Sequence, residues 1–139
     1  MATVKGILVN DGGAPARIMN FIAAAAISAG EGLRIDAAGK AALATDNNLP
    51  LAGVALTDAA AGGQCSMVTG SGVILYMICE ENVNRGDSLM TDTASGATAG
   101  SLIVWAVGSH TDDIAVACAL EDAPALVDSA RGLTKVLVF

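Results

Sequence analysis

Short apolar runs separated by polar turns follow one another along most of the chain. The first two, "TVKGILV" (Thr3–Val9) and "ARIMNFI" (Ala16–Ile22), flank "NDGGAP", in which Asn, Asp, Gly and Pro favour a turn. This pattern predicts a hairpin or an extended N-terminal arm. Further along, "GLRID", "KAALAT", "LAGVAL", "CSMVT" and the final "KVLVF" are typical of short strands.

Two runs in the second half indicate which strand faces are covered. "GVILYMICE" (Gly72–Glu80) is apolar at both sets of alternating positions, which is typical of a strand covered on both sides, by the same domain or by a neighbouring subunit. "IAVACAL" (Ile114–Leu120) carries large apolar residues on one face and alanines on the other. We expect the large residues to face the core and the alanines to face a closely packed neighbour.

A helix is predicted in one segment, "APALVDSARG", where Pro124 stands near the start and Gly132 follows the last turn. The pattern as a whole predicts an all-β fold, a small β-barrel or β-tulip built from two similar halves, with an N-terminal arm and one short C-terminal helix. We divide the chain into an N-terminal arm or hairpin (1–20), a β-barrel with an internal repeat (21–122) and a C-terminal helix and strand (123–139).

The prediction of two halves comes from a repeat. Gly, Leu and Asp recur at the same spacing in "AGEGLRIDAAGKAA" and "NRGDSLMTDTASGATAG", as Gly30, Leu33 and Asp36 and then as Gly86, Leu89 and Asp92. Downstream, "GVALTDAAAGGQCSMV" is echoed by "WAVGSHTDDIAVACAL". We interpret the repeat as the chemistry of a repeated turn, with the Asp residues capping turns and the Leu residues filling the core.

Composition and charge narrow the class of protein. Hydrophobic residues make up 53% of the chain but aromatic residues only 3%, so the apolar excess comes from small side chains. No run approaches the roughly 20 apolar residues of a membrane-spanning helix, and the start lacks the blocks of a signal peptide, so we expect no membrane partner and synthesis in the cytoplasm. The net charge of −7, with acids concentrated in residues 41–130, disfavours nucleic-acid binding.

Candidate catalytic and metal-binding groups are few. The single histidine, His110, could form a catalytic triad with a serine and an aspartate, and the candidates are Ser66, Ser109, Asp112 and Asp113. The chain lacks a G-x-S-x-G elbow, however, and adjacent residues alone do not adopt the geometry of a triad. Two acidic groups were weighed as cation sites, one around His110 and one formed by Glu80, Glu81 and Asp87. Neither has an EF-hand spacing, so we interpret these acids as solvated turn residues.

Other chemistry is equally sparse. The chain has neither a phosphate-binding Gly-rich motif nor strands with interleaved basic and aromatic residues. Three widely spaced cysteines, Cys65, Cys79 and Cys118, indicate buried small apolar side chains rather than disulfides or a zinc site. We therefore expect no enzyme activity, no metal and no cofactor.

The runs "ISAGEGLRIDAAGKAALA", "PLAGVALTDAAAGGQCSMVTGSGVILYM" and "VNRGDSLMTDTASG" resemble the small capsid decoration, or cement, proteins of tailed bacteriophages. The resemblance rests on turn glycines and small strand residues, and SAF-like β-barrels share such turns. It implies a β-barrel or β-tulip that forms homo-oligomers, often trimers, and clamps the outer surface of a viral capsid through terminal arms. The partner would be the major capsid protein and the location the virion.

A candidate partner interface follows from the arms and the charge distribution. Both ends of the chain are mildly basic and carry apolar residues, whereas the middle is acidic. The candidate residues are Lys5, Ile7, Val9, Arg17, Ile18, Met19, Phe21, Lys135, Leu137 and Phe139.

Two other classes of function stay open from the sequence. One is a SAF-like barrel that works beside a catalytic domain, in which Glu80, Glu81 or His110 would line a cleft. The other is a different self-assembling structural protein, such as a shell component or the base of a fibre.

Overall fold

The computed structural model describes residues 8–10, 17–45, 51–69, 72–80, 83–91, 100–105, 114–122 and 132–139, and within these ranges it contains strands and turns but no helix. The strands are β1 (Leu8–Asn10), β2 (Arg17–Ile22), β3 (Gly32–Ile35), β4 (Ala41–Leu43), β5 (Gly53–Ala55), β6 (Gln64–Thr69), β7 (Ile74–Cys79), β8 (Ser88–Thr91), β9 (Leu102–Val104), β10 (Ala117–Ala119) and β11 (Gly132–Val138). The predicted all-β class is confirmed. The segment of the predicted C-terminal helix lies outside the described residues, except for its last residue, Gly132, which begins β11.

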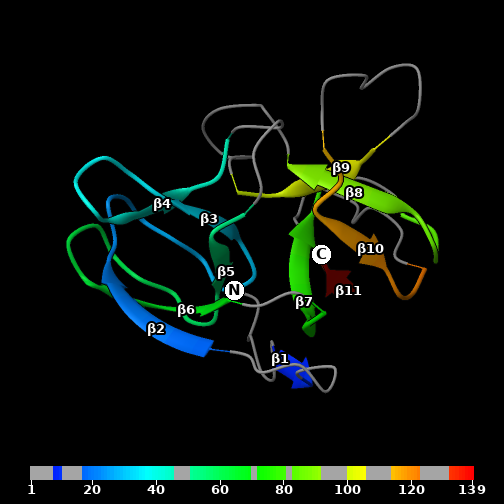
Figure 1. The fold of residues 1–139 in the computed structure, drawn as a ribbon, viewed down its shortest axis with the longest axis horizontal. Helices are drawn as coiled ribbons and strands as arrows, with labels where there is room; N and C mark the ends of the chain where they lie inside the picture. The colour runs from blue at the N-terminus through cyan, green and yellow to red at the C-terminus, as the bar shows by residue number, and fades with distance from the viewer. Residues whose placement is uncertain are drawn as a thin grey trace.

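The strands form two five-stranded barrels that lie side by side (Figure 1). The first barrel has the strand order β2-β6-β5-β3-β4, and a parallel bridge between Ala23 and Ala41 joins its two ends. The second has the order β7-β11-β10-β8-β9, and a parallel pair between Cys79 and Leu102 closes it. β1 pairs with β7 as an additional strand.

The two barrels share one register as well as one strand order. Leu33 pairs with Leu43 in the first barrel, and Leu89 pairs with Val104 at the same place in the second. Two residues that occupy the same place in the two registers are called equivalent below. The prediction of two similar halves is therefore confirmed, but each half is a closed barrel rather than half of one barrel.

Small side chains fill the narrow interior of each barrel. In β10, Ala117 and Ala119 are buried inside the second barrel, whereas Cys118 between them is only partly buried. Our expectation that the larger residues of Ile114–Leu120 would face the core holds for Val116, which is buried, but not for Cys118 and Leu120, which are only partly buried. A closed five-stranded barrel leaves little room inside, so alanines line it where larger side chains such as Leu89 and Met77 reach in from other strands.

β7 is covered on both faces, as its sequence predicted. Leu75, Met77 and Cys79 point into the second barrel and are buried, and none of the intervening residues is exposed. The core around them continues past the second barrel, because it also includes Ala29 and Val54 of the first. The first barrel therefore supplies part of the cover over the second.

Two further expectations change. β1 pairs with β7 while β2 pairs with β6, so the two N-terminal strands do not form a hairpin with each other. The echo of "GVALTDAAAGGQCSMV" is also displaced, because β5 is equivalent to β10 and β6 to β11. The matching sequences are "VALTDA" and "CALEDA", and β11 completes the second barrel.

Candidate partner interface

The repeated glycine lies in a tight turn before β3 and again before β8. Gly30 and Gly86 have φ angles of 92° and 91°, a backbone conformation that glycine adopts without steric cost. In the first turn the Glu31 carboxylate accepts the N–H of Ser28, three residues earlier. In the second, Asp87 Oδ2 accepts the N–H of Asn84 at 2.8 Å.

A second acid from the neighbouring strand end completes each turn. Asp58 Oδ1 accepts the N–H of Ala29 at 2.8 Å, and Asp122 Oδ1 accepts the N–H of Arg85 at 2.8 Å. Asp58 and Asp122 are the aspartates of "VALTDA" and "CALEDA". Sequence reasoning missed this pair, although the shared A-L-x-D-A signal was present.

The turn after β3 has its own capping aspartate. Asp36 Oδ1 accepts the N–H groups of Ala38 and Lys40, both at 2.9 Å, as an aspartate does in an Asx turn. The expectation that Asp36 caps a turn is confirmed. Its repeat partner, Asp92, lies outside the described residues.

The candidate catalytic groups fall into two sets. His110, Ser109, Asp112, Asp113 and Glu81 lie outside the described residues. Among those described, Ser66 donates its hydroxyl to Asn20 Oδ1 at 2.9 Å, and Glu80 Oε1 accepts the Ser101 hydroxyl at 2.8 Å.

Within the described ranges no cluster of three His, Cys, Asp or Glu residues is arranged to hold a metal ion. The same ranges contain no helix with the length and apolar character needed to cross a membrane.

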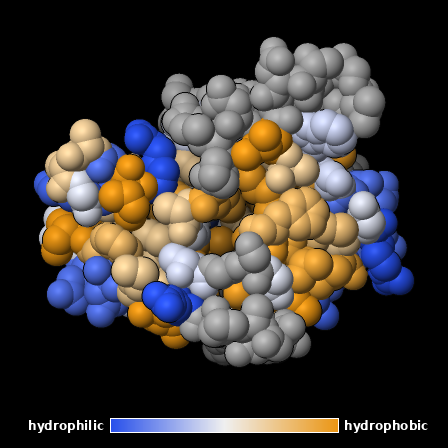
Figure 2. All heavy atoms as spheres, in the orientation of Figure 1, coloured by the Kyte–Doolittle hydropathy of each residue, from blue (hydrophilic) through white to orange (hydrophobic). Residues whose placement is uncertain are grey.

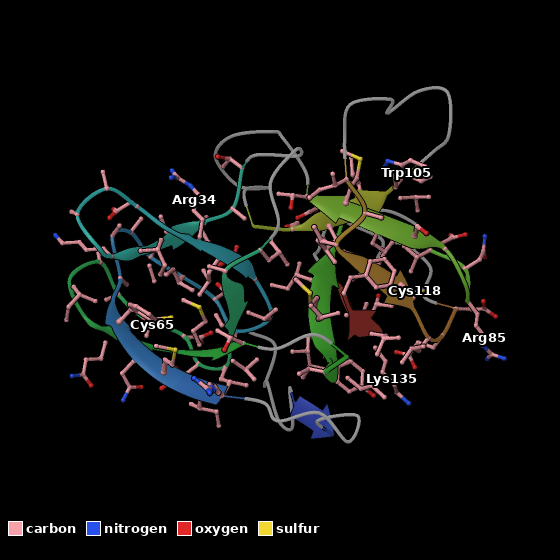
Figure 3. All side chains as sticks on the ribbon, viewed as in Figure 1. Arg34, Cys65, Arg85, Trp105, Cys118 and Lys135 are labelled. Carbon is pink, nitrogen blue, oxygen red and sulfur yellow. The ribbon has the colours of Figure 1, made fainter. Side chains whose placement is uncertain are left out.

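The three cysteine thiols differ in burial. Cys65 and Cys79 are buried and Cys118 is partly buried. Figure 3 shows Cys65 within the first barrel and Cys118 on the second. Burial raises the pKa of the Cys65 thiol, which keeps that thiol protonated and unreactive at neutral pH.

The predicted interface residues fall on both barrels. Arg17, Ile18, Met19 and Phe21 lie along β2, where the first three are exposed and Phe21 is partly buried. Lys135 and Leu137 lie on β11, and Phe139 follows that strand with 55% of its surface exposed. Val9 lies on β1, and Lys5 and Ile7 lie outside the described residues. That these residues bind a partner stays a prediction.

Apolar exposure is concentrated on the first barrel. The large apolar side chains that are exposed in the described part of the chain are Ile18, Met19, Ile22, Ile35 and Phe139. Sequence reasoning missed Ile22 and Ile35, because their spacing does not distinguish them from core residues. In Figure 2, apolar side chains extend over the faces of both barrels, and the most polar ones gather mainly at the two ends of the view.

β2 presents an open strand edge where its equivalent is covered. Ile74 and Leu75 of β7 pair with Asn10 and Leu8 of β1. The equivalent residues of β2, Ile18 and Met19, pair with β6 on one side only among the described strands. Met19 is 45% exposed, whereas Leu75 is 1% exposed. This edge, residues 18–20, is the candidate partner interface.

The backbone polarity of this edge follows from the pairing with β6. Ala23 N–H donates to Gly63 O at 2.8 Å, so the residues of β2 that hydrogen-bond to β6 are those in alternation with Ala23. The N–H groups of Ile18 and Asn20 therefore point away from β6, toward the open edge. An extended segment laid along β2 would meet free donors there and apolar side chains beside them.

Comparison with known proteins gives one informative result. No protein-family model and no curated protein sequence matches the chain. A solved structure, the head fiber gp8.5 N base of bacteriophage phi29, is similar in fold, with a TM-score of 0.64. The likeness covers 90% of this chain and 95% of that chain at 16% sequence identity. At that identity the likeness shows a shared fold: the paired barrels of this chain resemble the base of a phage head fibre.

Proposed function

We propose that this protein is a structural subunit of a bacteriophage virion that binds the outer surface of the capsid and stabilises it. The observation that carries the proposal is the fold likeness to the phi29 head fiber N base, which extends over nearly the whole length of both chains. The sequence resemblance to capsid decoration proteins supports the same role. The protein would be made in the host cytoplasm, and its partner would be the major capsid protein.

The open edge of β2 suggests how the capsid is bound. β1 adds to β7 as an antiparallel strand at Ile74 and Leu75. We infer that an extended segment of the capsid protein adds to β2 in the same way at Ile18 and Met19. Strand addition gains affinity from main-chain hydrogen bonds, and many copies on one shell give avidity, so each contact can be modest.

A binding experiment tests the role. The purified protein is mixed with undecorated capsid shells, and bound protein is measured by co-sedimentation and imaged by electron microscopy. We expect ordered density on the outer surface and a higher temperature of shell rupture when the protein is bound. Protein that stays in the supernatant at every concentration contradicts the proposal.

A matched pair of variants tests the strand-addition mode. Asn20→Pro removes an N–H that points to the open edge, while the hydrogen bonds of β2 to β6 stay in place. Asn20→Val keeps the N–H, and both variants lose the side-chain hydrogen bond with Ser66. We expect Asn20→Pro alone to lose shell binding. Equal binding by both variants contradicts strand addition at this edge. The virion role itself is tested separately, by the binding of the wild-type protein to shells.

A second candidate is the base of a head fibre, which the name of the similar structure favours. Both candidates attach to the capsid, but a fibre base also carries a part that projects from it. Images of whole virions separate them: density that continues outward beyond the two barrels supports the fibre base, and its absence supports a decoration protein.

A further inference from the structure

The junction between the two barrels joins two different surfaces. On the first barrel it uses the turn before β3, and on the second it uses the end of β7 and the turn before β9. Ile78 N–H donates to Gly30 O at 2.9 Å, and Gly32 N–H donates to Gly100 O at 2.7 Å. Gly100 N–H in turn donates to Ala44 O at 3.0 Å. The contact is therefore head to tail.

Because the barrels are equivalent, each also carries the surface that its neighbour uses. On the second barrel, the turn before β8 (residues 85–88) is equivalent to the turn before β3, and we call it the turn face. On the first barrel, Ile22 and Gly39 are equivalent to Ile78 and Gly100, and we call these two residues, with the nearby Ala24 and Lys40, the strand face. Neither face takes part in the junction within the chain.

We propose that a second copy of this chain docks by repeating the internal junction, with the strand face of one copy against the turn face of the next. In that contact Ile22 N–H of one copy would donate to Gly86 O of the other, as Ile78 N–H donates to Gly30 O within the chain. The proposal concerns a second copy of the chain and does not rest on the proposed virion role.

The exposure of equivalent residues supports the proposal. Ile78 is 7% exposed at the internal junction, whereas Ile22 is 42% exposed. Gly30 and Gly100 are buried, whereas their equivalents Gly86 and Gly39 are exposed. An apolar residue of this size left open at a position that is covered in the equivalent barrel is what an unoccupied copy of the same contact would leave.

The exposed apolar side chains follow the same asymmetry. Ile18, Met19, Ile22 and Ile35 all lie on the first barrel, and the equivalents of Met19 and Ile35, Leu75 and Thr91, are each 1% exposed. The second barrel is thus covered where the first is open. Of these residues, Ile22 belongs to the strand face, whereas Ile18 and Met19 lie at the edge of β2 whose equivalent on the second barrel is covered by β1.

The repeated junction would place one lysine and one aspartate near each other. In the internal junction Glu31 lies beside Gly100, since a Cβ atom at that glycine would lie 3.3 Å from Glu31 Oε2. The equivalent of Glu31 is Asp87, and the residue after Gly39 is Lys40. Repeating the junction therefore brings Gly39 and the adjacent Lys40 of one copy near Asp87 of the next, on a turn face that also carries Arg85.

The turn face lies where a row of copies requires it. Figure 3 shows Arg85, on the turn face, at the end of the second barrel that is farthest from the first barrel. A contact between two different surfaces closes into a ring if its rotation allows and otherwise continues as a filament. It does not produce an isolated two-fold dimer.

Cysteine cross-linking tests the contact in the full-length chain. In a Cys118→Ser background, which removes the partly exposed native thiol, Lys40→Cys is combined with Asp87→Cys. Because Asp87 also caps its own turn, a second pairing uses Lys40→Cys with Ser88→Cys. Under mild oxidation both pairings should give a ladder of covalent oligomers on a denaturing gel, whereas each single variant should run as a monomer.

Other results overturn the proposal. Covalent dimers from a single-cysteine variant indicate a two-fold contact between like faces. Absence of cross-links in both pairings, together with a monomer mass from light scattering at high protein concentration, indicates that the faces do not meet.

A variant without cysteine changes gives an independent measurement. Ile22→Asp places a charge on the strand face, and Phe139→Asp places one on an exposed apolar residue outside both faces. We expect Ile22→Asp to weaken self-association about tenfold or more, and Phe139→Asp to leave it unchanged, with both proteins folded by circular dichroism. An equal effect of the two variants contradicts the assignment of the strand face, and this readout needs no capsid.

Discussion

Asp122 has the same role in the second barrel as Asp58 has in the first. Each carboxylate accepts the N–H of the second residue of a glycine turn at 2.8 Å. The two turns differ in their surroundings, because Ala29 is buried against the second barrel while Arg85 is exposed. Variants of Asp58 and Asp122 therefore compare the same hydrogen bond in a buried and in an exposed turn.

We predict that Asp58→Ala destabilises the protein more than Asp122→Ala. Removing Asp58 leaves the buried N–H of Ala29 without its acceptor, which costs about 1–3 kcal/mol, whereas water can replace Asp122 at Arg85 for about 1 kcal/mol or less. Urea denaturation of both variants gives the two free energies of unfolding. Asp58→Asn keeps an acceptor oxygen and should recover most of the loss. A larger cost for Asp122→Ala would contradict the assigned burial of the two turns.

Two equivalent glycines give a second matched comparison. Gly39 and Gly100 have φ angles of 80° and 83°, so alanine is strained at both, by about 1–2 kcal/mol. A Cβ atom at Gly39 meets nothing within 4 Å, but one at Gly100 lies 3.0 Å from Leu43 Cδ2 and 3.1 Å from Glu31 Cβ. We expect Gly100→Ala to cost about 1–3 kcal/mol more than Gly39→Ala in urea denaturation. Equal costs would show that the junction yields to the added methyl group.

The sequence predicted the features that depend on local spacing. The recurrence of Gly30 and Leu33 as Gly86 and Leu89 correctly indicated two equivalent units, because a turn that needs a left-handed residue and a strand that needs a core leucine leave a fixed pattern. The apolar run of β7 likewise indicated cover on both faces. These inferences rest on chemistry within a few neighbouring residues.

Features that depend on distant contacts were beyond the sequence. The echo of "GVALTDAAAGGQCSMV" in "WAVGSHTDDIAVACAL" was displaced, since Cys118 in fact takes the place of Val54. The three residues of β1 carry nothing that selects β7 over β2 as a partner. Exposure at Ile22 depends on a contact between barrels, since the equivalent Ile78 is buried at the junction while Ile22 is exposed.

Thiol reactivity should separate the three cysteines. In the folded protein at neutral pH we expect a maleimide or a disulfide reagent to modify Cys118 first, because Cys65 and Cys79 are buried. Mass spectrometry of digested protein identifies the labelled residue. Rapid labelling of Cys65 without denaturant would contradict its burial inside the first barrel.

The raised pKa of Cys65 also predicts a pH dependence of stability. Folding disfavours the thiolate, so the contribution of this group is complete below the ordinary thiol pKa of about 8.5 and declines as the pH rises from there toward the higher folded value. The difference in free energy of unfolding between the wild type and Cys65→Ala should therefore be constant near pH 7 and shrink above pH 8.5 or so. A difference that stays constant up to alkaline pH would contradict the raised pKa.

The shared core predicts that the two barrels unfold together. Ala29, Val54 and Val68 of the first barrel belong to the same buried cluster as Leu75 and other core residues of the second. Leu33 and Leu89 are equivalent and fully buried, so Leu33→Ala and Leu89→Ala should each cost about 2–5 kcal/mol. Each should move one cooperative transition, seen alike by circular dichroism and by the fluorescence of Trp105 on the second barrel.

If Leu33→Ala produced an early transition that the Trp105 signal does not follow, the first barrel would be unfolding alone. The junction would then be too weak to couple the barrels. In that case the internal junction would no longer support the proposed contact between two copies of the chain.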